Sequence, residues 1–105
     1  MNKQIIPAGG LSTSSVVVAV KEQIHSNLAG ETVILNLDSG VYYGLNEVGS
    51  RVWEMVQEPV AVNAIRDALL EEYKITADDC EKELLSLLET LAENRLIEVK
   101  HEASA

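Results

Sequence analysis

Residues 35–53 of this chain read LNLDSGVYYGLNEVGSRVW. The segment Asp-Ser-Gly at 38–40 suits a short hairpin turn, because glycine adopts positive φ without steric cost. It separates an alternating pattern over residues 31–37 from a second strand over 41–45. Asn46 follows as a helix N-cap. The stretch therefore predicts a β-hairpin that leads directly into a helix.

A further strand is predicted before this hairpin. The β-branched and then alternating residues from Val16 to about His25 favour extended structure, and residues 26–30 read as the next turn. Along 31–37 the set Val33, Leu35 and Leu37 alternates with the set Thr32, Ile34 and Asn36. Three short antiparallel strands form a meander that needs another layer packed on one face.

Three helices are predicted after the strands. The first begins at Asn46 and stops before Pro59, which cannot continue a helix. The second covers residues 62–73 and has no clear cap at its start. The third covers residues 77–94, with a capping box in Thr76-x-x-Asp79. Residues 96–99 suit a short closing strand. The predicted class is α+β.

The third helix has an apolar stripe and one apolar residue outside it. Cys80, Leu84, Leu87 and Leu91 lie within about 60° of one another at 100° per residue, which is typical of a core-facing stripe. Leu88 lies at the edge of this stripe. Leu85 lies about 140° from Cys80, which predicts a position near solvent. It is either an ordinary exposed leucine or part of a second apolar edge that lines a groove.

The length of 105 residues fits one domain. Residues 1–15 are rich in Gly, Ser and Thr and predict a flexible N-terminal arm. Residues 16–99 form the predicted domain, and 100–105 a polar tail.

The charge of the chain disfavours two classes of partner. Eight basic against seventeen acidic residues give a formal net charge of −9, which repels nucleic-acid phosphates and anionic lipids. We therefore expect neither a nucleic-acid nor a membrane partner, although three helices with strands also suit a DNA-binding winged helix. No apolar run is long enough for a bilayer span, and the N-terminus lacks the apolar core of a secretory signal. These features predict a cytoplasmic protein.

The residues that usually carry chemistry are scattered along the chain. His25 lies in a predicted strand or turn, His101 in the tail, and Cys80 on the core stripe, so no nucleophile is paired with a base. One cysteine and two separated histidines do not supply the ligands of a structural zinc site. We therefore expect no catalytic residue, no metal site and no cofactor. Trp53 is expected in the core, as a lone large aromatic on a helix stripe.

The string Tyr-Tyr-x-Leu-Asn-x-x-Gly-x-x-x-Trp at 42–53 resembles the PqqD family, whose members supply the recognition element for ribosomal peptide modification. The resemblance covers about residues 33–99 and is greatest to the small stand-alone members found in lasso-peptide biosynthesis. Two positions differ from the family pattern. Asn94-Arg95 stands where members often have Gly, and Ala61-Val62 where they often have a Ser or Thr cap.

The resemblance implies a winged helix-turn-helix-like domain that binds the leader of a precursor peptide as an added strand. The leader would pair with residues 41–45 and lie against the third helix, because an open strand edge supplies backbone hydrogen bonds and alternate side-chain pockets. Tyr42 and Tyr43 point to opposite faces of their strand, and the sequence leaves open which of them meets the peptide. The candidate peptide-binding residues are Val41, Tyr42, Tyr43, Gly44 and Leu45 at the edge, Leu84, Leu85 and Leu88 as an apolar wall, and Asp78 and Glu81 as acids selecting a basic leader.

The resemblance also implies partners. A precursor leader peptide would be presented to a leader protease and a cyclase, with no catalysis by the chain itself. The alternative is a peptide chaperone for a radical-SAM modifying enzyme, as in pyrroloquinoline quinone biosynthesis. An open strand edge also allows pairing with a second copy, so the expected state is a monomer or a weak strand-swapped dimer.

Overall fold

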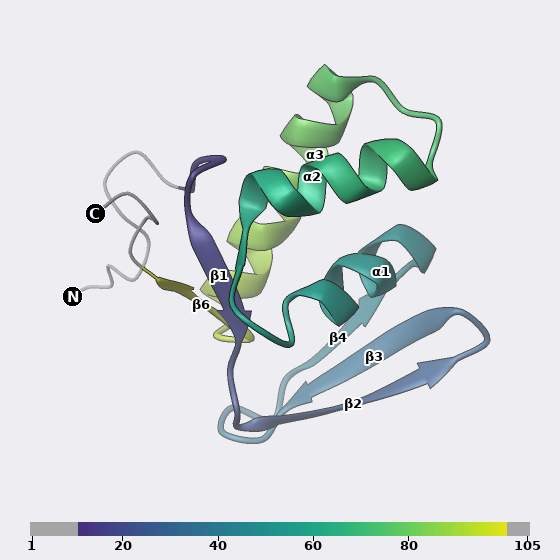
Figure 1. Ribbon diagram of the computed structural model, residues 1–105. Coiled ribbons are helices and arrows are strands. Elements are labelled where there is room, and N and C mark those ends of the chain that lie inside the picture. The colour runs from purple at the N-terminus through teal and green to yellow at the C-terminus, as the bar shows by residue number, and fades with distance from the viewer. Residues whose placement is uncertain (1–10, 101–105) are drawn as a thin grey trace.

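The computed structural model describes residues 11–100. Within these residues six strands and three helices follow one another (Figure 1). Their bounds, in chain order, are β1 Val16–Ala19, β2 Gln23–Leu28, β3 Glu31–Asn36, β4 Tyr42–Leu45, α1 Glu47–Met55, β5 Val60–Ala61, α2 Val62–Glu72, α3 Ala77–Glu93 and β6 Ile97–Lys100. The α+β class and the meander followed by three helices are confirmed.

The strands form two antiparallel sheets, in the orders β5-β1-β6 and β2-β3-β4. The single strand predicted from Val16 to about His25 is wrong, because the chain changes sheet near residues 20–22. Val17 is buried and pairs with both Val60 and Val99. Residues 23–28 instead pair with β3, so the predicted turn at 26–30 is shortened to its last two residues.

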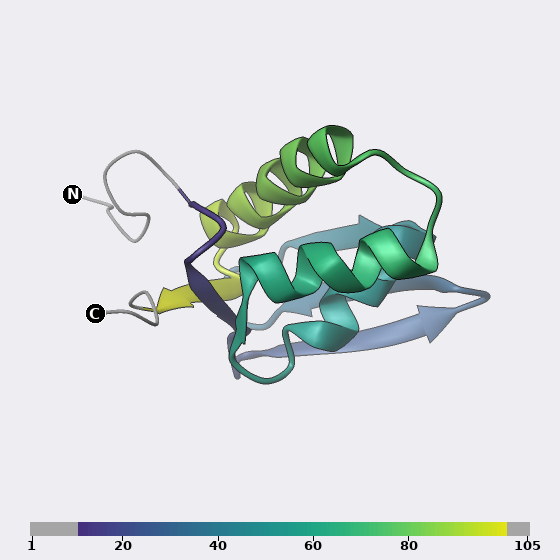
Figure 2. The same cartoon turned by 45° about the horizontal axis from the view of Figure 1, so that its top comes forward.

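The register of the β2-β3-β4 sheet fixes which side chains face the helices. Thr32, Ile34 and Asn36 are buried, whereas the more apolar set of Val33, Leu35 and Leu37 is not. The buried Asn36 is fully satisfied, since its amide donates to backbone carbonyls and its oxygen accepts from the turn that follows. All three helices lie on one side of this sheet (Figure 2).

The helix starts follow the predicted caps where a cap was predicted. The Asn46 side chain accepts from Gly49 N at 2.9 Å, and the Thr76 hydroxyl accepts from Asp79 N at 3.2 Å. Helix α2, as expected, has no side-chain cap. Its first amides instead donate to two carbonyls of the preceding chain, from Val62 N to Ser15 O and from Asn63 N to Thr13 O, both at 2.9 Å.

This capping corrects the extent of the predicted N-terminal arm. Residues 11–15 are part of the fold, because their carbonyls satisfy the orphan amides of α2 and because Leu11 and Ser15 are buried. The predicted arm at 1–10 and tail at 101–105 lie outside the described residues, as does His101.

One core lies between the two sheets and the helices. Trp53 is buried, as predicted, and its ring forms a T-shaped contact with the His25 ring, with 5.8 Å between centroids. No helix within residues 11–100 has the length and apolarity that crossing a membrane requires. The largest fully buried side chains are those of Trp53, Ile34, Ile65, Leu88, Leu91, Leu96 and Ile97.

Candidate binding groove

Strand β4 has one free edge. In the described part of the chain it pairs only with β3. Asn36 N donates to Val41 O, and antiparallel pairs alternate between bonded and non-bonded, so Val41, Tyr43 and Leu45 direct their backbone groups toward β3. The backbone groups of Tyr42 and Gly44 consequently point toward the open edge.

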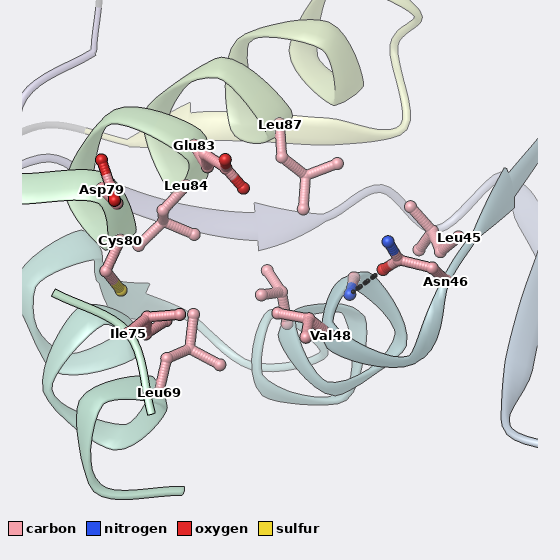
Figure 3. A pocket seen from close by; sticks show the side chains of 12 residues that line it. Leu45, Asn46, Val48, Leu69, Ile75, Asp79, Cys80, Glu83, Leu84 and Leu87 are labelled. Atoms are coloured by element: carbon pink, nitrogen blue, oxygen red, sulfur yellow. Dashed lines mark hydrogen bonds between the residues drawn. The ribbon is translucent and has the colours of Figure 1, made fainter. Parts of the chain in front are cut away.

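An apolar cavity of about 330 Å³ lies beside the end of this strand. It is bounded by the β4–α1 junction on one side and by α3 on the other, with Leu69 and Ile75 closing one end (Figure 3). Val48 and Ile75 are exposed at its surface. Its lining residues are Leu45, Asn46, Val48, Gly49, Val52, Leu69, Ile75, Asp79, Cys80, Glu83, Leu84 and Leu87.

Gly49 allows the strand and helix to meet closely at this cavity. A Cβ at position 49 would lie 3.2 Å from two atoms of the Leu45 side chain and 3.4 Å from Asn46 Oδ1. The Gly-x-x-x-Trp spacing therefore has a packing reason: Gly49 faces the β4–α1 junction while Trp53 fills the core one turn later.

Helix α3 presents one edge to the cavity. Relative to Leu84, Leu87 lies about 60° to one side and Glu83 about 100° to the same side at helical spacing. Leu87 is half-buried, and the carboxylates of Asp79 and Glu83 are exposed at the rim. The cavity thus combines an apolar interior with an acidic border.

The structure brings some of the predicted site residues together. Leu45 and Leu84 both line the cavity. Val41, Tyr42 and Gly44 are exposed along β4 or just before it, and Tyr43 is half-buried against the core. The tyrosine that faces outward is therefore Tyr42. A Cβ at Gly44 would meet nothing within 4 Å, so residues 11–100 leave the space beside this glycine open.

The other predicted residues lie on the opposite edge of α3. Leu88 is 0% exposed, so its side chain is enclosed in the core. Leu85 is half-buried against the core, whereas the sequence predicted a position near solvent. Glu81 accepts a 2.8 Å hydrogen bond from Arg66, and Asp78 is exposed outside the cavity lining. Of the predicted apolar wall of Leu84, Leu85 and Leu88, only Leu84 lines the cavity, where Leu87 lies beside it.

Leu87 was missed because it was assigned to the core stripe. The buried face of α3 is centred on Leu84, Leu88 and Leu91, which leaves Leu87 at its border. Glu83 and Leu87 are four residues apart and therefore share one edge of the helix. Which edge of a helix faces a groove depends on the position of the neighbouring strand, and periodicity does not supply that position.

The cavity wall contains one cysteine, Cys80, whose thiol is free and buried. Burial raises the pKa of Cys80, with acidic neighbours raising it further and Arg66 opposing them. Its Sγ lies 3.9 Å from the Arg66 carbonyl oxygen, as a weak donor. A raised pKa disfavours the thiolate, which is the nucleophilic form. Among residues 11–100, no group of three His, Cys, Asp or Glu side chains is arranged to hold a metal ion.

Comparison with known proteins gives one family and two solved structures. Residues 31–97 match the family described as "Coenzyme PQQ synthesis protein D (PqqD)". A structure described as "TbiB1 in Complex with the TbiA(beta) Leader Peptide" is 31% identical, with a TM-score of 0.71, over 76% of this chain and 93% of that one. A comparison with curated proteins gave no match.

A second solved structure shares the fold at lower identity. It is described as "Lasso peptide synthetase B1 complexed with the leader peptide", is 21% identical, and has a TM-score of 0.69 over 77% of this chain and 95% of that one. The family match spans residues 31–97 and so includes both β4 and the cavity-facing part of α3.

Proposed function

Because this chain belongs to the PqqD family, we propose that it binds the leader segment of a ribosomally made precursor peptide and presents it to a leader protease and a cyclase in lasso-peptide biosynthesis. The observation that carries the proposal is the open edge of β4 beside the apolar cavity. The relative at 31% identity is described in complex with a leader peptide.

The leader adds to β4 as an antiparallel or parallel neighbour. Its backbone pairs with the groups of Tyr42 and Gly44 that point to the open edge. Successive side chains of a strand alternate in direction, so every second leader residue faces α3. An apolar residue at such a position enters the cavity between Leu45 and Leu87.

The leader is recognised in part by charge. Neither Asp79 nor Glu83 has a salt-bridge partner within residues 11–100, and both lie on the cavity border. A basic leader residue beside the apolar anchor pairs with them, and the contribution falls with salt because both carboxylates are exposed.

The chain acts by binding and carries out no catalysis itself. Holding the leader raises the effective concentration of the attached core peptide at the enzyme that modifies it. The buried Cys80 thiol and the placement of His25 against Trp53 support this role, since within residues 11–100 the side-chain bonds of these groups go to the Arg66 carbonyl and to Gln23.

A titration of labelled leader peptide by fluorescence anisotropy tests the proposal. Wild-type protein is expected to give saturable binding, and a leader N-methylated at alternate residues is expected to bind much more weakly, because it lacks the donors that strand pairing needs. A leader methylated at the intervening residues is the matched control. Equal binding of both methylated leaders would rule out strand addition, and absence of binding to any leader would rule out the function.

The same assay separates this function from the alternative as a chaperone for a radical-SAM enzyme. The match to the PQQ synthesis family is the observation that favours the alternative. The leader of a lasso precursor and the PQQ precursor are titrated in parallel. Preference for the lasso leader supports the proposed function, and preference for the PQQ precursor supports the alternative.

A further inference from the structure

The β2-β3-β4 sheet has an apolar face that no element of residues 11–100 covers. The helices lie on its other side (Figures 1 and 2). Four of the seven exposed large hydrophobic residues in the described chain lie on this face or at its β3–β4 turn, two more line the groove, and Val41 is in register with the inward-facing Asn36. The four are Ile24, Leu28, Leu37 and Tyr42.

Three side chains form a continuous row across this face. Ile24 pairs directly with Leu35, and Leu35 pairs directly with Tyr42. Because Ile34 faces the helices, its neighbour Leu35 and the two residues in register with it face outward. Ile24 is 55% exposed and Tyr42 is 69% exposed. The row spans the full width of the sheet.

Strand β2 orients its side chains opposite to the usual pattern. An antiparallel sheet with one covered face normally turns its apolar residues inward. Here Gln23, His25 and Asn27 are on the helix side, whereas Ile24 and Leu28 face outward. A shift of one residue in register would reverse this arrangement, so the observed register places apolar groups on the uncovered face. That arrangement suits a face that a partner covers.

The charges around the face indicate which partner fits. The row itself is uncharged in a chain of net charge −9. Three carboxylates border it: Glu31 opposite Leu28, Asp38 after Leu37, and Glu22, whose carbonyl accepts from Leu37 N, with Lys21 as the neighbouring cation. A second copy would bring two acidic borders together, which disfavours self-association. A partner with an apolar patch and a basic border complements the surface.

We propose that this face is the docking surface for the enzyme that processes the bound peptide, through an uncharged apolar patch bordered by lysine or arginine. That this enzyme processes the bound peptide rests on the proposed function. Strand β4 belongs to both surfaces, since its edge faces the groove while Tyr42 lies in the outer row. An enzyme docked on the face is therefore adjacent to the leader and meets the core peptide that emerges from the groove.

Binding of a purified leader peptidase of lasso-peptide biosynthesis is measured by titration calorimetry at low and high salt. Ile24→Lys is expected to weaken peptidase binding by at least about tenfold. Ser86→Lys, at an exposed position on α3, is the matched control and is expected to leave peptidase binding unchanged. Ile24→Thr keeps a β-branched residue and tests the loss of apolar area without added charge. Circular dichroism verifies that each variant is folded.

The outcomes separate this docking surface from the peptide groove. Leader binding is expected to be unchanged in all three variants, because Ile24 lies on the strand farthest from the groove. Equal peptidase binding by wild type and Ile24→Lys, or no peptidase binding at all, would overturn the proposal. Self-association of the wild type that Ile24→Lys abolishes would assign the face to a second copy instead. Ile24-dependent peptidase binding without leader binding would support the docking surface and refute the proposed function.

Discussion

The side-chain amide of Asn36 donates a 3.0 Å hydrogen bond to the backbone carbonyl of Arg95. It thereby joins the turn after β3 to the turn after α3, which are 59 residues apart in sequence. The same amide approaches the Asn94 carbonyl at 3.4 Å, and its oxygen accepts from the amides of Asp38 and Ser39. One buried side chain thus fixes the hairpin that carries β4 relative to the helix that forms the other wall of the groove.

Asn36→Ala is expected to lower the free energy of unfolding by about 2 kcal/mol, because it removes four hydrogen bonds of a buried side chain and leaves their part-buried backbone partners without it. Chemical denaturation measures the loss. Asn27→Ala is the control, since Asn27 is exposed and, within residues 11–100, its side chain donates one hydrogen bond, to the Thr32 hydroxyl at 3.3 Å. Equal losses for the two variants would contradict the structural role given to Asn36.

Arg95→Gly is expected to stabilise the fold by about 0.5–1 kcal/mol, because φ is 61° at Arg95 and glycine adopts this conformation without strain. The turn has the two bonds of a Schellman motif, from Leu96 N to Leu91 O and from Arg95 N to Ala92 O. Thermal unfolding measures the gain. Arg95→Ala keeps the strain, so an equal gain in that variant would show that backbone conformation is not the cause.

Glu72→Gln is expected to destabilise the protein at neutral pH but not in acid. Arg51 binds Glu72 through two 2.9 Å hydrogen bonds between α1 and α2, and these lower the pKa of the Glu72 carboxyl. A carboxyl with a lowered folded-state pKa stabilises the fold above its unfolded pKa, and this contribution disappears as pH falls through the folded value. Urea unfolding across pH measures the difference, which should be small because the pair is exposed. A difference that persists in strong acid would refute this assignment.

Leu87→Asp is expected to weaken leader binding by at least about tenfold, since a carboxylate there is placed in the apolar cavity beside Glu83. Leu85→Asp is the matched control, because both leucines are half-buried on α3 but Leu85 lies outside the cavity lining. Anisotropy titration compares the two variants after circular dichroism has verified that both are folded. A greater loss of leader affinity in Leu85→Asp than in Leu87→Asp would show that the leader binds the Leu85 edge of α3, as the sequence predicted.

Gly44→Ala is expected to raise stability by about 0.5–1 kcal/mol, because its Cβ would enter open space and the unfolded chain would lose freedom. Gly49→Ala is expected to gain less stability, since the added Cβ would lie 3.2 Å from the Leu45 side chain. It should also weaken leader binding, because Leu45 forms a cavity wall. Thermal unfolding and anisotropy provide the two measurements, and an unchanged affinity in Gly49→Ala would count against the cavity as the binding site.

The sequence determined the local elements of this protein. Turn glycines, the caps at Asn46 and Thr76, and the stop before Pro59 act within a few residues, so the hairpin and three helices could be predicted from the chain alone. The resemblance carried by residues 42–53 likewise lies in one continuous segment. The open edge of β4 was also predicted, because β4 is the last strand of the meander.

Only the tertiary structure decided how those elements face one another. The change of sheet after Ala19 depends on pairing with β5 and β6, both far along the chain. The inward orientation of Asn36 depends on carbonyls near residue 95, and the choice of Leu87 over Leu85 depends on where β4 lies beside α3. Periodicity specifies which residues share a face, but contacts distant in sequence specify what that face meets.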